Sequence, residues 1–213
     1  MFERVLSEDA KNSLALLGKS GLLVNAYLAG GTALALQFGH RYSYDFDFFT
    51  QEEFDSRILI QRIARIIPSF KPEKTAWGTI LGYIQDTRFS LFFYKYPLIS
   101  RSREFLGINV ADSKDIAPMK VAAIADRGLK RDFIDLYFIL EKQRILTLGD
   151  ALDLYDKKFG VLQQNKVHIL KSLNYFDDAD KDEVPQMIEP IDWLTVKKFF
   201  EREVRILSEE LLG

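Results

Sequence analysis

The sequence contains no cysteine, only two histidines and no excess of charge of one sign. Without cysteine, disulfides, thiolate zinc sites and cysteine nucleophiles are all excluded. The histidines are His40 and His168, so a multi-histidine metal site is excluded too, whereas hard oxygen ligands remain available. Lys and Arg number 29 against 31 Asp and Glu, which gives a formal net charge of -2. Because the chain has no overall excess of positive charge, any surface that binds phosphate must be a local cluster of basic residues.

Long hydrophobic runs are also absent. No uninterrupted apolar stretch reaches the roughly 20 residues that a membrane-spanning helix needs. The first residues, MFERVLSEDAKNS, carry charge too early and too often for a secretory signal peptide. We therefore expect a cytoplasmic protein that has no membrane partner.

What is present is enough apolar material for a continuous core, because 47% of the 213 residues are hydrophobic and 13% are aromatic. The order of predicted strands and helices along the chain indicates an α+β fold in two domains. Residues 1–111 are expected to form a mixed sheet flanked by helices, and residues 112–213 a helical bundle.

The spacing of apolar residues, together with helix-capping and turn residues, predicts the helices and strands of each half. In the first half we expect helices at 7–19, 32–38 and 52–67, strands at 24–29, 42–49 and 107–112, and two or three antiparallel strands within 74–99. In the second half we expect helices at 113–126, 129–142, 148–159, 166–176 and 195–212, with a solvated linker at 177–185.

The stretch YSYDFDFF places two carboxylates at alternate positions of a predicted strand. On a strand, Ser43, Asp45 and Asp47 point to one face. The other face carries Tyr44, Phe46 and Phe48. Packing of the aromatic face fixes the direction of the carboxylates. Two anions held so close need a cation between them. Mg²⁺ suits this position because it prefers carboxylate oxygens and keeps coordination sites for substrate phosphates.

Gly30-Gly31-Thr32 supplies a second half of such a site. Glycine lets the backbone approach a ligand closely, and a helix that begins at Thr32 directs unpaired N–H groups at an anion. Together, the two motifs suit a metal-bound nucleoside triphosphate, with phosphates at Gly31 and Thr32 and metal on Asp45 and Asp47.

The string GGTALALQFGHRYSYDFDFFT resembles the AbiEii/AbiGii family of nucleotidyltransferase toxins, which has a polymerase-β-like nucleotidyltransferase fold. The resemblance implies Mg²⁺ as cofactor and an NTP as substrate. It also implies a nucleotide-binding set that comprises Gly30, Gly31, Thr32, Arg41 and Ser43. Arg41 would reach a phosphate with its planar donor fork.

A second stretch, APMKVAAIADRGLKRDFIDLYFILEK, places Lys120, Arg127 and Arg131 seven and eleven residues apart. This spacing aligns them on one face of a continuous helix, provided that Gly128 does not break it.

This stretch resembles the downstream motif of the same family, a Lys on one helix and Arg-Asp-x-x-Asp on the next. The resemblance implies that Lys120 and Arg131 contact the nucleotide and that the helical domain packs against the active-site cleft. It also implies that Asp132 or Asp135 orients the acceptor, serves as base or supports the site. The alternative is an Arg131/Asp135 surface pair worth a few tenths of a kcal/mol.

The chain departs from the wider fold in one respect. Many of its enzymes carry a third carboxylate on a later strand, and the corresponding segment here, RFSLFFYKYP, has none. Ser90 would take that place. Either Asp132 or Asp135 completes the acidic set, or the metal site is poorer than usual.

These observations predict an Mg²⁺-dependent nucleotidyltransferase that moves an NMP from an NTP to a hydroxyl acceptor. By resemblance, the acceptor is a tRNA end or a protein, and the enzyme is the toxin of a toxin–antitoxin or phage-defence pair with a cognate antitoxin. Two alternatives remain: a catalytically weak nucleotide- or RNA-binding module, and a small-molecule nucleotidyltransferase of the antibiotic-modifying kind.

Overall fold

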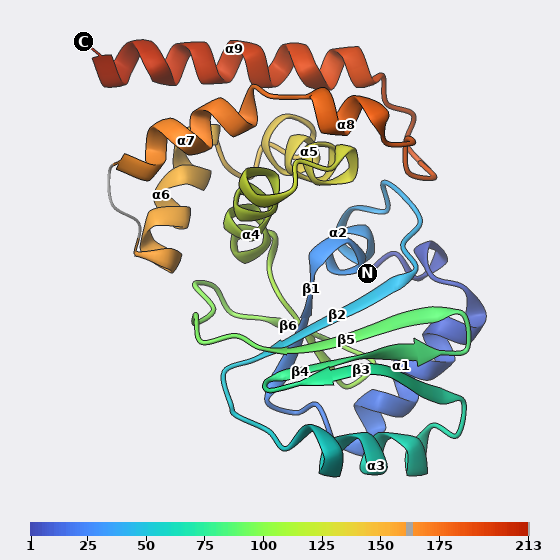
Figure 1. The fold of residues 1–213 in the computed structure, drawn as a ribbon. Coiled ribbons are helices and arrows are strands. Elements are labelled where there is room, and N and C mark those ends of the chain that lie inside the picture. Colours follow the sequence, from blue (N-terminus) through green and yellow to red (C-terminus); the bar gives the residue numbers. More distant parts are fainter. Residues whose placement is uncertain (161–163, 213) are drawn as a thin grey trace. The chain divides into compact units, whose positions relative to one another are not determined.

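The structure is a computed structural model that describes residues 1–160 and 164–212 (Figure 1). The chain divides into two compact units, Met1–Asp112 and Ser113–Gly213. No helix within the described residues combines the length and apolar character needed to cross a bilayer.

The first unit is built on one mixed sheet whose seven strands lie within residues 1–112, in the order β3-β4-β5-β2-β1-β7-β6. The strands are β1 (Ala26–Ala29), β2 (Asp45–Thr50), β3 (Phe70–Ala76), β4 (Thr79–Ile84), β5 (Thr87–Phe93), β6 (Arg103–Phe105) and β7 (Ile108–Val110). β2 is central, antiparallel to β1 and parallel to β5. β3, β4 and β5 form the predicted antiparallel meander.

The helices of this unit are α1 (Glu8–Ser20), α2 (Gly30–Phe38) and α3 (Ser56–Ile66), preceded by a 3-10 turn at Glu3–Val5. The Ser7 side chain caps α1 by accepting a hydrogen bond from the Ala10 amide at 3.2 Å. Gly39 ends α2 in the left-handed conformation with φ 68°. α1 and α3 lie on one side of the sheet, and α2 lies on the other (Figure 1).

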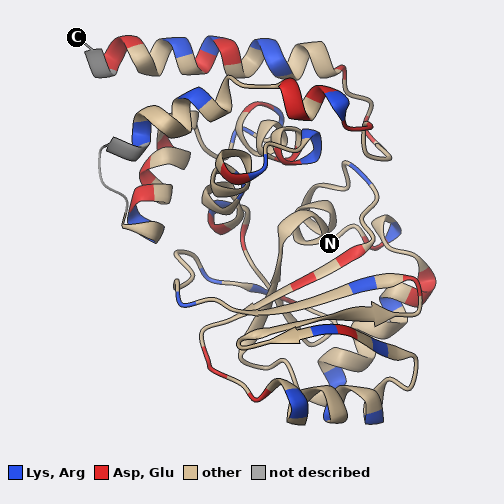
Figure 2. Cartoon of the chain, in the orientation of Figure 1, with Lys and Arg blue, Asp and Glu red and all other residues tan. Residues whose placement is uncertain are grey.

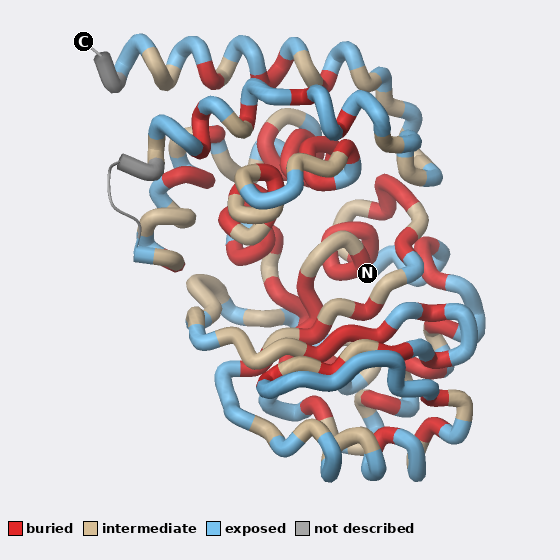
Figure 3. The backbone as a smooth tube through the Cα atoms, in the orientation of Figure 1, coloured by how far each residue is buried: buried red, intermediate tan, exposed pale blue. Residues whose placement is uncertain are grey.

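The core of the first unit explains why the carboxylates of β2 share a face. Phe46 and Phe48 are fully buried and alternate with Asp45 and Asp47, which are partly exposed. Phe89 of β5 packs against Phe48 with ring centroids 5.7 Å apart. The central strands are buried, whereas the edge strand β3 is exposed (Figure 3). The aromatic face of β2 therefore holds the opposite face in a fixed direction.

The second unit is helical. Its elements are α4 (Ser113–Asp126), α5 (Lys130–Tyr137), a π-helical turn (Phe138–Lys142), α6 (Leu148–Phe159), α7 (Gln164–Leu173), α8 (Asp177–Lys181) and α9 (Trp193–Leu212). Phe133 of α5 is fully buried, and its ring lies 5.3 Å from that of Phe200 and 5.2 Å from that of Phe176. This aromatic cluster joins α5 to α9.

Two expectations for the first unit need correction, and one strand was not expected. The helix predicted at 52–67 begins at Ser56, because the Asp55 carboxylate accepts hydrogen bonds from the Arg57 and Ile58 amides at 2.8 and 3.1 Å. Tyr44 precedes β2 and is 53% exposed, so it does not join the buried aromatic face. The three-residue strand β6 was not predicted, since so short a segment carries no periodic signal.

Two expectations for the second unit are also wrong. The predicted linker contains α8, a short helix that begins with Asp177 and Asp178 in its first turn, where the helix dipole favours acidic residues. Gly128 adopts φ 56° and separates α4 from α5. Lys120, Arg127 and Arg131 therefore do not lie on one continuous helix.

Candidate active site

The glycine pair forms the turn that leads from β1 into α2. Gly30 has φ 65°, a backbone conformation that residues other than glycine rarely adopt. A Cβ at position 30 would lie 3.0 Å from Oδ2 of Asp47, and one at position 31 only 2.0 Å from Nη2 of Arg41. The two glycines thus make room for a carboxylate and a guanidinium of the same unit.

The start of α2 is suited to binding an anion. The helix is 9 residues long and begins at Gly30 rather than at Thr32. Its N-cap, Ala29, provides no side-chain hydrogen bond to the first-turn amides. Uncapped amides and the positive end of the helix dipole attract negative charge. The absence of a side-chain cap is compatible with the phosphate that the sequence predicts at this end of α2.

Two buried hydroxyls connect α2 to the beginning of β2. Thr32 Oγ1 lies 2.7 Å from Ser43 Oγ and also donates a hydrogen bond to the Asp45 carbonyl. Since a hydroxyl has one proton, Ser43 is the donor in the bond between the two side chains. Thr32 is 1% exposed and Ser43 is 5% exposed. These bonds hold Asp45 beside the first turn of α2.

The carboxylate face of β2 extends onto both neighbouring strands. Asp47 is paired with Ala29 of β1 and with Ser90 of β5, and Asp45 is paired with Arg88. Among the described residues, no three His, Cys, Asp or Glu side chains are grouped to hold a metal ion. Asp45 and Asp47 therefore form a two-carboxylate set. Such a set fits Mg²⁺, which proteins usually bind through one or two carboxylates together with substrate phosphates.

Arg41 places a guanidinium beside the glycine turn. The residue is 6% exposed, and its Nη1 donates a hydrogen bond to the Tyr42 carbonyl at 3.0 Å. Its Nη2 lies over Gly31. The sequence predicts that Arg41 reaches a phosphate from a loop. It does not indicate that Gly31, which has no side chain, leaves the space that the guanidinium occupies. A buried guanidinium offers several fixed donors to a phosphate.

The predicted residues of the second unit form an ion-pair cluster. Lys120 Nζ lies 2.8 Å from Oδ1 of Asp132 and 2.7 Å from Oδ2 of Asp135. Arg127 donates to the Asp132 carboxylate from Nε at 3.0 Å and from Nη2 at 3.3 Å. The side chains of both aspartates are fully buried, and that of Lys120 is 7% exposed. Sequence reasoning gave Arg127 no role, although it completes the cluster.

The cluster keeps Asp132 ionised. Burial raises the pKa of this carboxyl, but the positive charges and hydrogen bonds of Lys120 and Arg127 outweigh it and hold the pKa below its ordinary value. Asp135 is also buried against Lys120, so it is not the surface partner considered in the sequence analysis.

Arg131 lies in the first turn of α5. It is exposed and lines a cavity of about 440 Å³ with Leu129 and the segment 182–186. The break at Gly128 places Arg131 in α5, whereas Lys120 lies in α4.

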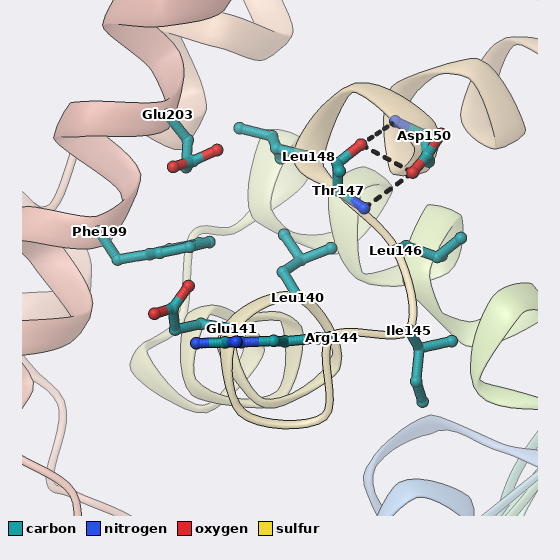
Figure 4. Close-up of a pocket in the computed structure, with 10 residues that line it drawn as sticks. All are labelled: Leu140, Glu141, Arg144, Ile145, Leu146, Thr147, Leu148, Asp150, Phe199 and Glu203. Carbon is teal, nitrogen blue, oxygen red and sulfur yellow. Dashed lines mark hydrogen bonds between the residues drawn. The ribbon is translucent and has the colours of Figure 1, made fainter.

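A further cavity of about 360 Å³ lies between the end of the π-helical turn, the start of α6 and α9 (Figure 4). Arg144 enters it from a left-handed backbone conformation, with φ 49°. Thr147 and Asp150 at its edge form the capping box of α6, shown by dashed lines in Figure 4. None of the predicted site residues lines this cavity.

Comparison with known proteins gives a consistent result over nearly the whole chain. Residues 14–80 and 83–207 match the profile of the family described as nucleotidyl transferase AbiEii toxin, type IV TA system. An uncharacterised protein of Aquifex aeolicus (strain VF5) is 38% identical over 211 residues, which cover 95% of this chain and 97% of that protein.

Two solved structures from Helicobacter pylori share the fold. One is described as a nucleotidyltransferase and has a TM-score of 0.57, and the other, JHP933, has a TM-score of 0.56. Each is 20% identical and covers 97% of this chain, with 97% and 94% of its own length matched. The predicted fold, a mixed nucleotidyltransferase sheet followed by helices, is confirmed.

Proposed function

Because the chain belongs to the AbiEii family of nucleotidyltransferase toxins of type IV toxin–antitoxin systems, we propose that it moves an NMP from an NTP to a hydroxyl acceptor and releases pyrophosphate. The enzyme class follows from the family. The proposal adds Mg²⁺ on Asp45 and Asp47, a tRNA end or protein as acceptor, a cognate antitoxin and a cytoplasmic site of action.

The observation that carries the proposal is the juxtaposition of the β1–α2 turn with the carboxylate face of β2. Gly30 lies against Asp47, and Thr32 is bonded to Asp45. An uncapped helix end for phosphates and two carboxylates for a metal thus lie within one compact unit. These are the two groups that a metal-bound triphosphate requires.

The chemistry assigns a role to each group. The acceptor oxygen attacks the α-phosphorus, the bond from phosphorus to the bridging oxygen breaks, and pyrophosphate leaves with that electron pair. The acceptor proton passes to a base. A bound Mg²⁺ would supply charge stabilisation and activate the attacking hydroxyl. Arg41 and the amides of α2 hold phosphate oxygens, while Thr32 and Ser43 position Asp45 through their hydrogen bonds.

We assign Lys120, Arg131, Asp132 and Asp135 to the same reaction, because the family match includes both stretches of sequence. Their contacts favour particular roles. The lowered pKa of Asp132 makes it a weak proton acceptor at neutral pH, since a general base works best with a pKa near the operating pH. Its role is therefore to hold Lys120 in position. Arg131, which is exposed in the first turn of α5, is assigned to a phosphate by the family match.

The test is pyrophosphate release by the purified protein with each of the four NTPs and Mg²⁺, using tRNA and protein fractions as acceptors. Release that requires Mg²⁺ and is lost in Asp45→Asn/Asp47→Asn supports the proposal. Absence of release with every NTP and acceptor would favour the second candidate, a weakly active nucleotide-binding module. The observation in favour of that candidate is Ser90, which stands beside Asp47 where a third carboxylate would complete the metal site.

A further inference from the structure

One row of side chains crosses the sheet on the same face as the carboxylates. The strand registers pair Asp45 with Arg88, Arg88 with Tyr83, and Tyr83 with Lys71. Paired residues in adjacent strands point to the same face, and adjacent strands lie roughly 4.8 Å apart. The row therefore leads from the predicted metal site at β2 to the edge strand β3, roughly 14 Å away.

A β-bulge adds a further cation to this face. The register of β3 shifts between Pro72 and Lys74, so that Lys74, rather than Glu73, is the residue paired with Leu81. Leu81 and Tyr83 are two positions apart in β4 and share a face. Bulges often redirect a side chain in this way. Lys74 and Lys71 are thus both directed to the face that carries Asp45.

The members of this row are available for binding. Arg88, Lys71 and Lys74 are exposed, and Tyr83 is 39% exposed. None of the three cations forms an ion pair with a residue that the structure describes, although Arg88 stands directly beside Asp45. In Figure 2, β5 carries blue Lys or Arg positions, and β3 carries both blue positions and a red acidic one. Cations that a protein does not neutralise itself are suited to an external anion.

We propose that Arg88, Tyr83, Lys71 and Lys74, here called the sheet-face row, bind the single-stranded end of an RNA acceptor and lead its terminal hydroxyl toward Asp45 and Asp47. An aromatic ring between cations matches a chain in which bases alternate with phosphates. Bases stack on exposed tyrosine without sequence preference, while Arg and Lys track the backbone. The proposal deepens the proposed function and rests on it for the identity of the transferred group.

The charges of the row favour nucleic acid over a peptide. A protein acceptor would offer one hydroxyl and no repeating anion. A single-stranded RNA offers a phosphate per nucleotide and an unstacked base for Tyr83. If RNA binds to the row, its association constant K should fall as the salt concentration rises. Each phosphate contact should contribute about 0.7 to the steepness of log K against log salt concentration.

The experiment measures binding of a fluorescent single-stranded RNA oligonucleotide by the full-length protein in EDTA without NTP, as a function of salt. Arg88→Ala, Lys71→Ala and Lys74→Ala should each reduce the salt slope by about 0.7. Tyr83→Ala should weaken binding about 5- to 100-fold with an unchanged slope, because it removes stacking only. Tyr83→Phe keeps the ring and should bind like the wild type.

The matched controls are Arg62→Ala and Arg65→Ala, which remove exposed cations from α3. α3 lies on the opposite side of the sheet, so these variants should bind RNA like the wild type. Unfolding temperatures confirm that all variants are folded. Equal loss of affinity in the α3 and sheet-face variants, or tighter binding of an acidic peptide than of RNA, would overturn the proposal. RNA binding is measured without turnover, so its failure is distinguishable from failure of pyrophosphate release.

Discussion

Ser90 of β5 stands directly opposite Asp47 of β2 in the parallel pairing of the two strands. Its side chain shares the carboxylate face and is 4% exposed. A carboxylate at this position would join Asp45 and Asp47 as a third metal ligand. We expect Ser90→Asp to lower the Mg²⁺ concentration that gives half-maximal transfer.

In metal-free buffer the same variant should be less stable by about 1–3 kcal/mol, because it buries a charge beside like charges. Ser90→Asn is the control, since it has a similar shape without the charge. Metal titrations of activity and denaturant unfolding of both variants check this expectation. Equal Mg²⁺ dependence of the Asp variant and the wild type would contradict it.

The metal assignment predicts the behaviour of Asp45→Asn/Asp47→Asn. Transfer should be abolished while the protein stays folded, because both side chains are partly exposed and the aromatic face of β2 is unchanged. The unfolding temperature in EDTA should be the same or higher, since two neighbouring anions are removed. Unchanged transfer by the double variant would exclude Asp45 and Asp47 as metal ligands.

Mg²⁺ and an NTP are expected to bind together, because one site holds both the metal and the phosphates. A ligand that binds only the folded protein raises its unfolding temperature according to its concentration relative to Kd. The increase with both present should exceed the sum of the separate increases, and Asp45→Asn should remove this excess. Additive increases for all four NTPs would argue against a shared site.

Gly31→Ala should displace Arg41 and weaken NTP binding. The added methyl would lie 2.0 Å from Nη2 of Arg41, whereas position 31 itself is helical and accepts alanine without backbone strain. We expect KM for the NTP to rise while kcat changes less, since a ground-state contact is lost.

Gly21→Ala is the control for the glycine variant. Gly21 has φ 66° with no heavy atom near its Cβ position, so alanine there costs about 1 kcal/mol of stability without moving any site residue. NTP titrations of the two variants separate the effects. A rise in KM for both would show that general destabilisation, rather than Arg41, is responsible.

The Lys120 cluster predicts a dependence of stability on pH. The pKa of Asp132 in the folded protein lies below its unfolded value of about 3.9, so its contribution is fully present above that pH and is lost as the pH falls through the folded pKa. Asp132→Asn should cost about 3–5 kcal/mol at neutral pH, with the difference from the wild type shrinking below about pH 4.

Lys158 offers a matched control for the catalytic role of this cluster. Lys158 and Asp115 form another ion pair, 3.1 Å long, with both side chains fully buried. Lys158→Met and Lys120→Met should both lower the free energy of unfolding. Only Lys120→Met should also change the kinetics of the folded fraction, measured as kcat and KM at a temperature well below unfolding. If kcat and KM were the same for the two variants, Lys120 would have a structural role and no catalytic one.

The fold was largely predictable because its signals are local. The Ser7 cap, the Gly39 stop and the alternation around Asp45 and Asp47 each depend on neighbours in sequence, and the structure contains all three. The predictions that were wrong also have physical reasons. Tyr44 continues the alternating pattern, yet the strand begins one residue later. α8 lies in a polar segment without apolar periodicity, where Ala179 is the buried residue of the helix.

The sequence alone determined the chemical identity of the candidate site: two carboxylates on one strand face, a glycine turn before a helix, and no cysteine or histidine cluster to compete with them. Only the tertiary structure decided what each group contacts. It placed Arg41 over Gly31, Ser90 beside Asp47, and Lys120 between two buried aspartates. The reason is that strand register and burial depend on pairings between segments far apart in the chain, which no local pattern specifies.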